Sequence, residues 1–211
     1  LMGSLFHMIC RERALELRLM TEMGYDVITL GNHEFDLKPA GLARILKSAR
    51  QYGKLPAIVS SNVIFSEKDD RDNTLEEVFR DGTVKPYTVI DRGGVKIGFF
   101  GLIGKDAAEV APFAKPVKFG DPAESAKKMV DLLRNREKVD LVVCLSHSGL
   151  NLDAISKSED VKLATRVPGI DIIISGHTHT PLKEPIIKGK TIIVQAWCNG
   201  LWAGIMDIVL R

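Results

Sequence analysis

The chain has 211 residues, of which 45% are hydrophobic and 27% are charged, and it is long enough to bury one sizeable α/β core. Its 29 basic and 27 acidic residues give a net charge of +2 without a concentrated basic block, so the charge gives no reason to expect a nucleic-acid polymer as partner. No apolar run approaches the roughly 18 residues that cross a bilayer. The three scattered cysteines predict neither a disulfide framework nor a zinc knuckle.

The first part of the chain predicts a β–α–β order. Residues 11–23 have apolar side chains at helical spacing and end at Gly24, which readily adopts the left-handed conformation that ends helices. The β-branched run 26–30 predicts a buried strand, residues 39–52 predict an amphipathic helix, and residues 57–60 predict a second strand.

The middle of the chain predicts an excursion, a hairpin and a helix. The polar, charge-rich residues 62–82 predict a long surface excursion. Residues 87–91 and 95–102 are joined through a Gly-Gly turn, which predicts an antiparallel pair of strands. The N-cap carboxylate, the proline and the glutamate of Asp121-Pro122-Ala123-Glu124 predict a helix that runs to about residue 137.

The last part of the chain predicts strands on either side of a helical stretch. Residues 140–146 and 171–175 predict apolar strands, with a polar helical stretch around 153–166 between them. Residues 186–196 and 201–210 predict further strands. Because the chain shows no internal repeat or linker, we expect one α/β domain over residues 1–211.

Three of the expected strands end in polar loops that contain histidine. These loops are Gly31-Asn32-His33, Ser146-His147 and Gly176-His177-Thr178-His179. Because the carboxyl ends of strands in an open α/β sheet line one edge, we expect the three loops to converge there. The alternative is that each histidine is a separate polar loop residue. This explains any one histidine alone, but it explains poorly why four of them lie at the ends of strands.

The histidine loops predict a cation site rich in nitrogen ligands. We expect His177 and His179 to lie in an extended loop with both rings on the same side, with Asn32 adding an amide oxygen and His147 a third imidazole. Such a set suits zinc, manganese, iron or nickel better than calcium. It has no negative charge, however, and two divalent ions held close together need carboxylate ligands that the set lacks.

His33 and Asp36 are spaced so that the carboxylate can fold back to the imidazole ring. An imidazole held in this way can contact a negatively charged group or protonate a leaving oxygen. The alternative is that Asp36 caps the following helix. We assign Glu34 a structural role, and Asn62 either contacts a ligand or forms a turn.

The glycines of residues 98–104 match neither the Rossmann fingerprint nor the Walker pattern, so we assign them to packing. We expect Trp197 and Trp202 to be core or interface aromatics.

The motifs Gly31-Asn32-His33-Glu34-Phe35-Asp36, Ser146-His147-Ser148-Gly149 and Gly176-His177-Thr178-His179, in this order, resemble those of the calcineurin-like metallophosphoesterases, specifically of the 5′-nucleotidase branch. The resemblance implies an α/β/β/α sandwich of mixed sheets. It implies that Asn32, His147 and His177 bind one metal ion and that His179 helps to bind a second. It also implies that His33 with Asp36 forms the catalytic dyad.

The same resemblance implies a reaction. Two divalent ions, drawn from Mn, Zn, Fe, Mg or Ni, hold a water or hydroxide that attacks phosphorus in line. The expected substrate is a phosphate ester, most simply a 5′-nucleotide that gives a nucleoside and phosphate. Nucleotides, cyclic nucleotides and UDP-sugars are not separated by the sequence. The resemblance also implies a periplasmic or extracellular location.

The sequence departs from the family pattern at its beginning. The family pattern opens with a strand that ends in Asp-x-His, followed by a Gly-Asp whose aspartate bridges both metals, and neither motif stands ahead of Gly31. We therefore expect a partial catalytic domain that lacks its first strand and a C-terminal nucleotide-recognition domain, and that has little activity by itself. The alternative is a non-catalytic binding or interaction module that keeps the fold with an incomplete metal site.

Overall fold

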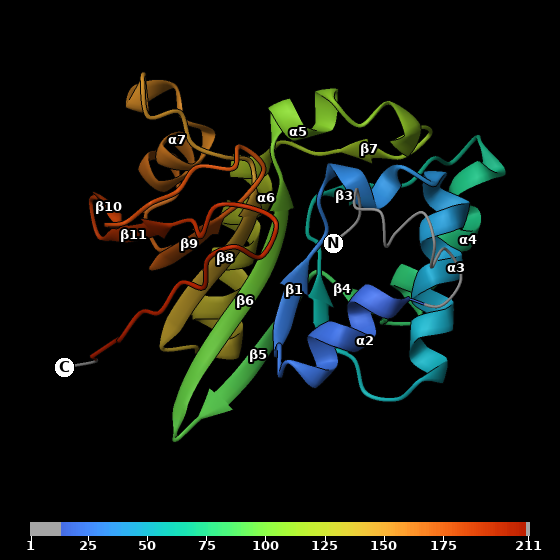
Figure 1. Ribbon diagram of the computed structural model, residues 1–211, viewed down its shortest axis with the longest axis horizontal. Coiled ribbons are helices and arrows are strands. Elements are labelled where there is room, and N and C mark those ends of the chain that lie inside the picture. The colour runs from blue at the N-terminus through green and yellow to red at the C-terminus, as the bar shows by residue number, and fades with distance from the viewer. Residues whose placement is uncertain (1–13, 210–211) are drawn as a thin grey trace.

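The computed structural model describes residues 14–209, which form two β-sheets packed face to face between two layers of helices (Figure 1). The smaller sheet is parallel, in the order β1-β2-β4. The larger sheet has the order β10-β11-β9-β8-β6-β5, in which β5 and β10 run antiparallel to their neighbours and the other pairs are parallel. The strands are β1 (Val27–Thr29), β2 (Ala57–Val59), β4 (Val84–Lys85), β5 (Tyr87–Arg92), β6 (Val95–Ile103), β8 (Leu141–His147), β9 (Ile172–Ser175), β10 (Ile186–Lys188) and β11 (Thr191–Val194).

The helices cover the outer faces of the two sheets. In Figure 1, α2, α3 and α4 lie outside the smaller sheet and α6 and α7 outside the larger one, whereas α5 follows β6 at the upper edge. A short antiparallel pair, β3 with β7, lies beside α5. The bounds are α2 (Leu15–Glu22), α3 (Lys38–Gln51), α4 (Asn73–Arg80), α5 (Lys105–Glu109), α6 (Pro122–Asp131), α7 (Glu159–Arg166), β3 (Val63–Ile64) and β7 (Lys118–Phe119). A π-helical segment (Leu132–Glu137) continues α6, and short 3-10 turns span Asn32–Phe35, Asp70–Asp72, Pro112–Ala114 and Ile155–Lys157.

Apolar side chains fill three layers, which confirms the predicted α/β/β/α sandwich. One cluster joins α3 and α4 to the smaller sheet, and a second joins α6 and α7 to the larger sheet. A third, formed by Val59, Val143, Leu145 and Ile172, lies between the two sheets. Burial of these side chains is the main favourable contribution to folding.

Gly101 marks the place where the two sheets approach most closely along β6. A Cβ atom added there would lie 2.2 Å from Thr29 Oγ1 and 2.3 Å from the Val59 carbonyl oxygen. These two neighbours are joined by a hydrogen bond, since Thr29 Oγ1 donates to the Val59 carbonyl at 2.9 Å. The prediction that the glycines of residues 98–104 serve packing is confirmed here.

We expect Gly101→Ala to lower the free energy of unfolding by roughly 1–3 kcal/mol, because the added methyl group forces the sheets apart. Urea unfolding followed by circular dichroism measures the change. Gly120→Ala is the matched control, because its added Cβ would have its nearest neighbour at 3.4 Å, an ordinary contact. Equal stability of the two variants would contradict a close contact at Gly101.

Most of the predicted elements are present. Helix α2 ends just before Gly24, which has a φ of 79°, although residues 11–13 of the predicted helix lie outside the described residues. The hairpin β5–β6 and the helix that begins after Asp121 are confirmed, and Asp121 accepts hydrogen bonds from Ala123 N and Glu124 N. None of the helices within residues 14–209 has the length and apolar character that a membrane span needs.

The prediction of a surface excursion was wrong. Residues 62–82 are not only a surface excursion, because α4 lies within them and buries Leu75 and Val78 against the smaller sheet. The strands predicted within residues 186–196 are confirmed as the hairpin β10–β11, which turns at Gly189, where φ is 61°.

The segment after Gly200 also differs from its prediction. Residues 201–209 form no strand, and Leu201 and Ile205 are 62% and 91% exposed. The β-branched composition is present, but within residues 14–209 no strand pairs with this segment. Trp197 and Trp202 pack edge to face with ring centroids 5.6 Å apart and are both 39% exposed. They are therefore not core aromatics, and the alternative that they are interface aromatics stays a prediction.

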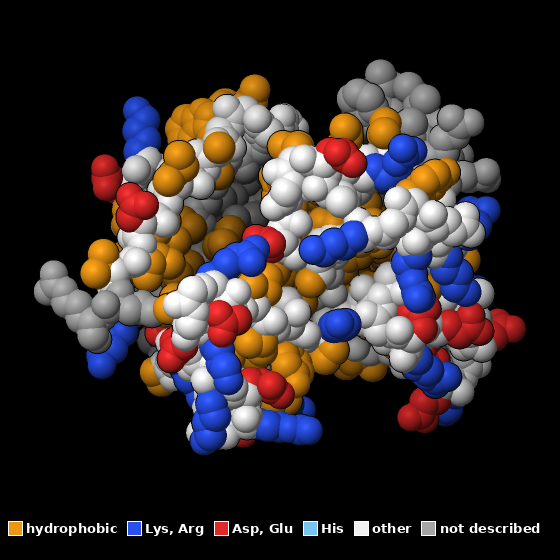
Figure 2. All heavy atoms as spheres, turned by 90° about the horizontal axis from the view of Figure 1, so that it is seen from below, with side chains coloured by type: hydrophobic (Ala, Val, Ile, Leu, Met, Phe, Trp, Pro, Cys, Tyr) orange, Lys and Arg blue, Asp and Glu red, His pale blue; other side chains and the backbone are white. Residues whose placement is uncertain are grey.

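The surface agrees with the nearly balanced charge of the sequence. Figure 2 shows Lys and Arg side chains interspersed with Asp and Glu side chains, not gathered by sign, on the face seen from below.

Candidate metal and phosphate site

The loops after β6, β8 and β9 lie side by side at one edge of the larger sheet. The strand register places Ile103 opposite His147 and Ser146 opposite Ser175. Gly104 N donates to the His147 carbonyl at 3.0 Å, which continues the pairing beyond β6. This parallel pairing explains why segments distant in sequence reach one place.

Asn32 comes to the same place from the smaller sheet. It follows β1 as the first residue of the 3-10 turn Asn32–Phe35, and it is 5% exposed. Its Oδ1 lies 2.8 Å from His147 Nε2. The turn is held by Glu34, whose Oε2 accepts a hydrogen bond from Gly31 N at 2.5 Å. Glu34 is 3% exposed, and its structural role is confirmed.

His177 reaches His147 from the loop after β9. Its ring centroid lies 5.1 Å from that of His147, with an angle of 56° between the ring planes. His177 Nε2 also lies 2.9 Å from Asp106 Oδ2 in α5. We call Asn32, Asp106, His147 and His177 the histidine cluster.

Asp106 is a member of the cluster that the sequence did not predict. It follows β6 at the same sheet edge as the histidines, but only the glycines of that loop were considered. Its carboxylate places one negative charge next to His177, and its side chain is 64% exposed. A carboxylate shortly after an apolar strand was the available signal.

Burial controls the protonation of His147. Loss of contact with water lowers its pKa from 6.5 to about 4, and the charge of Glu34 opposes this shift only in part. The ring is therefore neutral at pH 7. A neutral imidazole is the form that binds a metal ion.

His33 and Asp36 form the predicted pair, with His33 Nδ1 and Asp36 Oδ2 2.9 Å apart. The two side chains are 58% and 39% exposed, so the imidazole is oriented and still accessible to a ligand. Asp36 follows the 3-10 turn and does not provide a side-chain cap for α3.

His179 is not brought into the cluster. The expectation of an extended loop was wrong, because His177 and His179 have φ values of 68° and 51° and Thr178 N donates to the Gly176 carbonyl at 2.8 Å. Within residues 14–209, the exposed His179 side chain makes no hydrogen bond or ring contact.

Asn62 is structural. Its Nδ2 donates to the carbonyls of Ile103 and Gly120 at 2.8 and 3.1 Å, and its Oδ1 accepts from Ile103 N at 3.0 Å. Because its Nδ2 and Oδ1 atoms are both hydrogen-bonded and the residue is 2% exposed, it has no polar atom left for a ligand. Its role is to join the end of β6 to the chain ahead of α6.

The cluster has the donor chemistry for one cation but not for two. One amide oxygen and two imidazoles, next to one carboxylate, suit a divalent ion that accepts nitrogen ligands. The contacts are pairwise, however, and no group of three or more His, Cys, Asp or Glu side chains within residues 14–209 is gathered tightly enough to hold a metal ion. A second ion would require carboxylates that these residues do not supply.

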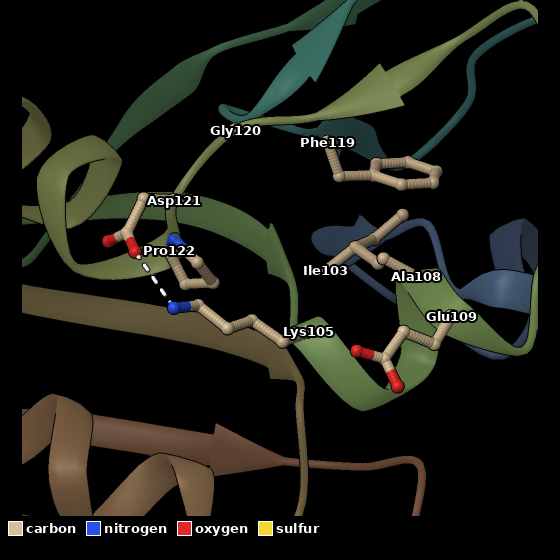
Figure 3. Close-up of a pocket in the computed structure, with 9 residues that line it drawn as sticks. Ile103, Lys105, Ala108, Glu109, Phe119, Gly120, Asp121 and Pro122 are labelled. Carbon is tan, nitrogen blue, oxygen red and sulfur yellow. Dashed lines mark ion pairs between the residues drawn. The ribbon is translucent and has the colours of Figure 1, made fainter.

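A pocket of about 330 Å³ lies between the end of β6, α5 and the segment ahead of α6 (Figure 3). Its walls include Ile103 at the end of β6, Phe119 and the ion pair of Lys105 with Asp121, whose Nζ and Oδ2 are 3.1 Å apart. Phe119 packs edge to face on Phe35, with centroids 5.3 Å apart. None of the four residues of the histidine cluster lines this pocket.

We expect Gly31→Ala to displace the His147 ring, because an added Cβ atom would lie 2.7–2.9 Å from three atoms of that ring. The nuclear Overhauser effect between the rings of His147 and His177 measures the displacement, and circular dichroism verifies that the fold is kept. Gly120→Ala serves again as the control, and an unchanged ring contact in Gly31→Ala would show that Gly31 does not set the position of the ring.

Comparison with known proteins agrees with this architecture. Residues 10–181 match the calcineurin-like phosphoesterase family, and the chain belongs to that family. Its relatives include curated 5′-nucleotidases.

Individual relatives are several times longer than the chain. It is 34% identical over 213 residues to the trifunctional nucleotide phosphoesterase protein YfkN of Bacillus subtilis, covering 92% of this chain and 14% of that protein. It is 33% identical over 216 residues to a 5′-nucleotidase of Vibrio vulnificus, covering 91% of this chain and 36% of that protein. The solved structure of a 5′-nucleotidase precursor from Thermus thermophilus superimposes with a TM-score of 0.72 at 33% identity, over 92% of this chain and 37% of that one. The chain thus spans about a third or less of the length of these relatives.

Proposed function

We propose that the chain contributes the catalytic part of a metal-dependent phosphohydrolase that cleaves a phosphate ester, most simply a 5′-nucleotide. The observation that supports this function is the meeting of Asn32, His147 and His177 from three remote segments. The names of the relatives add the class of substrate, because they describe nucleotide phosphoesterases and 5′-nucleotidases.

Each residue of the site has a proposed task. The Asn32 amide oxygen and the imidazoles of His147 and His177 would hold a divalent cation, which when bound supplies positive charge against the phosphoryl oxygens. His33, held by Asp36, donates a proton or a hydrogen bond to a phosphoryl or leaving oxygen. We propose His179 as a donor to a second cation, because its exposed ring is not engaged within residues 14–209.

The proposal covers the phosphoesterase part of the protein. We propose that recognition of the nucleoside depends on a further domain, since the relatives are much longer than the stretch that matches this chain. Because the Thermus thermophilus relative is described as a precursor, we extend to this protein the proposal of a periplasmic or extracellular location.

Metal content and phosphate release test the function together. The chain of residues 1–211 is incubated with Mn²⁺, Co²⁺ or Zn²⁺, and phosphate is measured from 5′-AMP, a cyclic nucleotide and a UDP-sugar. We expect at most one bound ion per chain and slow release that a chelator abolishes, because the described donors fit one cation. Activity that is unchanged by a chelator would contradict the proposal.

The second candidate is a binding module without catalysis. The observation that favours it is the lack of a group of three metal-binding side chains within residues 14–209. In that case the naturally expressed protein would bind a nucleotide but release no phosphate with any of the three metals. Metal-dependent turnover by the natural protein would exclude this candidate.

A further inference from the structure

Two acidic side chains at the start of α7 contact the loops that form the histidine cluster. Glu159 and Asp160 are the first two residues of that helix. Acidic residues in the first turn normally favour their own helix N-terminus. The carboxylates of these two residues instead accept hydrogen bonds from residues outside α7.

Asp160 joins the loops after β8 and β9. Ser146 Oγ donates to Asp160 Oδ1 at 2.6 Å, and Ser175 Oγ donates to Asp160 Oδ2 at 2.6 Å. Gly149 N donates to the same Oδ2 at 3.1 Å. Ser146 directly precedes His147, and Ser175 lies two residues before His177.

Glu159 holds the third loop. Its Oε2 accepts a hydrogen bond from Lys105 N at 2.9 Å, and its Oε1 accepts from Asp106 N at 3.1 Å. These two amides belong to the first turn of α5, so Glu159 takes up donors that a short helix leaves open. The position of Asp106, the partner of His177, is thereby tied to α7.

Asp160 is an acid in a place that disfavours its charge. It is 0% exposed, and burial raises its pKa from 3.8 to about 6 against the opposing effect of its serine hydrogen bonds. A carboxylate nevertheless offers two oxygens that accept several hydrogen bonds, which a neutral amide of the same shape cannot do. Three donors from two loops converge on these two oxygens.

We propose that Glu159 and Asp160 are positioning residues that set the arrangement of the histidine cluster. Their carboxylates bond to backbone amides and serine hydroxyls and not to the side chains of the histidine cluster. They act through Ser146, Ser175 and the first turn of α5. The proposal rests on the proposed function for its chemical consequence, but its geometry can be tested without metal or substrate.

Asp160→Asn in the metal-free chain is the first test, because it keeps the shape and removes one acceptor. The readout is the nuclear Overhauser effect between the rings of His147 and His177, whose centroids are 5.1 Å apart. We expect its intensity to fall by about half or more, since an NOE declines steeply when two rings separate. An unchanged intensity in the folded variant would overturn the proposal.

Asp72→Asn is the matched control for a general loss of stability. Asp72 is also 0% exposed and accepts a hydrogen bond from Ser66 N at 2.9 Å, but it lies among the elements that precede α4. We expect the ring contact between His147 and His177 to persist in this variant. Loss of that contact in Asp72→Asn as well would show that any buried defect has the same effect, and would overturn the specific role of Asp160.

Two further variants test the positioning role if Asp160→Asn does not fold. Ser175→Ala removes the hydrogen bond from Ser175 to Asp160, and Glu159→Gln removes the charge that accepts hydrogen bonds from the first turn of α5. We expect Ser175→Ala to weaken the ring contact, and Glu159→Gln to shift the Asp106 and His177 resonances while leaving that of Ser146 in place. Spectra equal to wild type in both variants would contradict the positioning role.

Cobalt titration links the positioning role to the site. We expect Asp160→Asn to bind Co²⁺ about 10–100-fold more weakly than wild type, the range known for partners that orient metal ligands, and Asp72→Asn to bind as wild type does. If the wild-type chain binds no Co²⁺ while Asp160→Asn still loses the ring contact, the proposed function fails and the positioning role stands. Equal Co²⁺ affinity and equal ring contact in Asp160→Asn and wild type would overturn the positioning role alone.

Discussion

His33→Ala in the naturally expressed protein is expected to lower phosphate release by about 10²–10⁴-fold, the usual contribution of a positioned general acid or base. The metal content is expected to stay the same. The reason is that His33 is paired with Asp36 and exposed, whereas the proposed cation donors are Asn32, His147 and His177. Steady-state kinetics with 5′-AMP and metal analysis of the same preparation measure the two quantities.

Asp36→Asn is a milder change in the same pair of residues. It keeps the imidazole and replaces its charged partner by a neutral one, so we expect a smaller loss of activity than for His33→Ala. Loss of metal in His33→Ala would contradict the division of tasks between the dyad and the cluster. Full activity of His33→Ala would show that the dyad is not catalytic.

His177→Ala is expected to abolish cation binding. The change removes one of two imidazoles of the cluster and leaves Asp106 without its partner at 2.9 Å. Because even an outer partner of a ligand is worth about 10–100-fold in metal affinity, we expect removal of a ligand to exceed that range. Isothermal titration with Mn²⁺ or Co²⁺ gives the affinity, and metal analysis gives the stoichiometry.

His179→Ala is the matched control, two residues away on the same loop. The exposed His179 ring makes no hydrogen bond or ring contact within residues 14–209. We therefore expect the His179→Ala variant to keep the first cation and to affect only a second one. Equal metal content in His177→Ala and wild type would remove His177 from the proposed ligand set. Loss of all metal in His179→Ala would show that the loop turns its second histidine toward the cluster when an ion is present.

The sequence predicted the convergence of the cluster because the pattern is local and repeated. Asn32, His147 and His177 each lie at or just after the end of an apolar strand. Parallel pairing brings the ends of β8 and β9 to one edge of the larger sheet, and Asn32 reaches His147 from the end of β1 in the smaller sheet. The α/β/β/α order followed from the resemblance and is confirmed by the three apolar layers. The exposed position of His179 could not be predicted, because it depends on the left-handed φ of two non-glycine residues.

The missed features differ in how much local signal they carry. Helix α4 has such a signal, because Leu75 and Val78 lie three residues apart and form its buried face, but the charged residues around them led to the prediction of a surface excursion. Asp106, Glu159 and Asp160 look like ordinary acidic residues of helix first turns. Their importance arises from tertiary contacts with other loops, which no spacing along the chain encodes.

The parallel neighbours β6, β8 and β9 have a thermodynamic consequence. Their pairing must be complete before His147 and His177 can face each other, so an unfolded chain has no preformed cation site. An ion that binds only the native state stabilises it by mass action, by about 2.7 kcal/mol when its concentration is one hundred times its dissociation constant. With the proposed cation site, the concentration of the ion would then determine the fraction of the protein that stays folded during heating or proteolysis, as well as the rate of the proposed reaction.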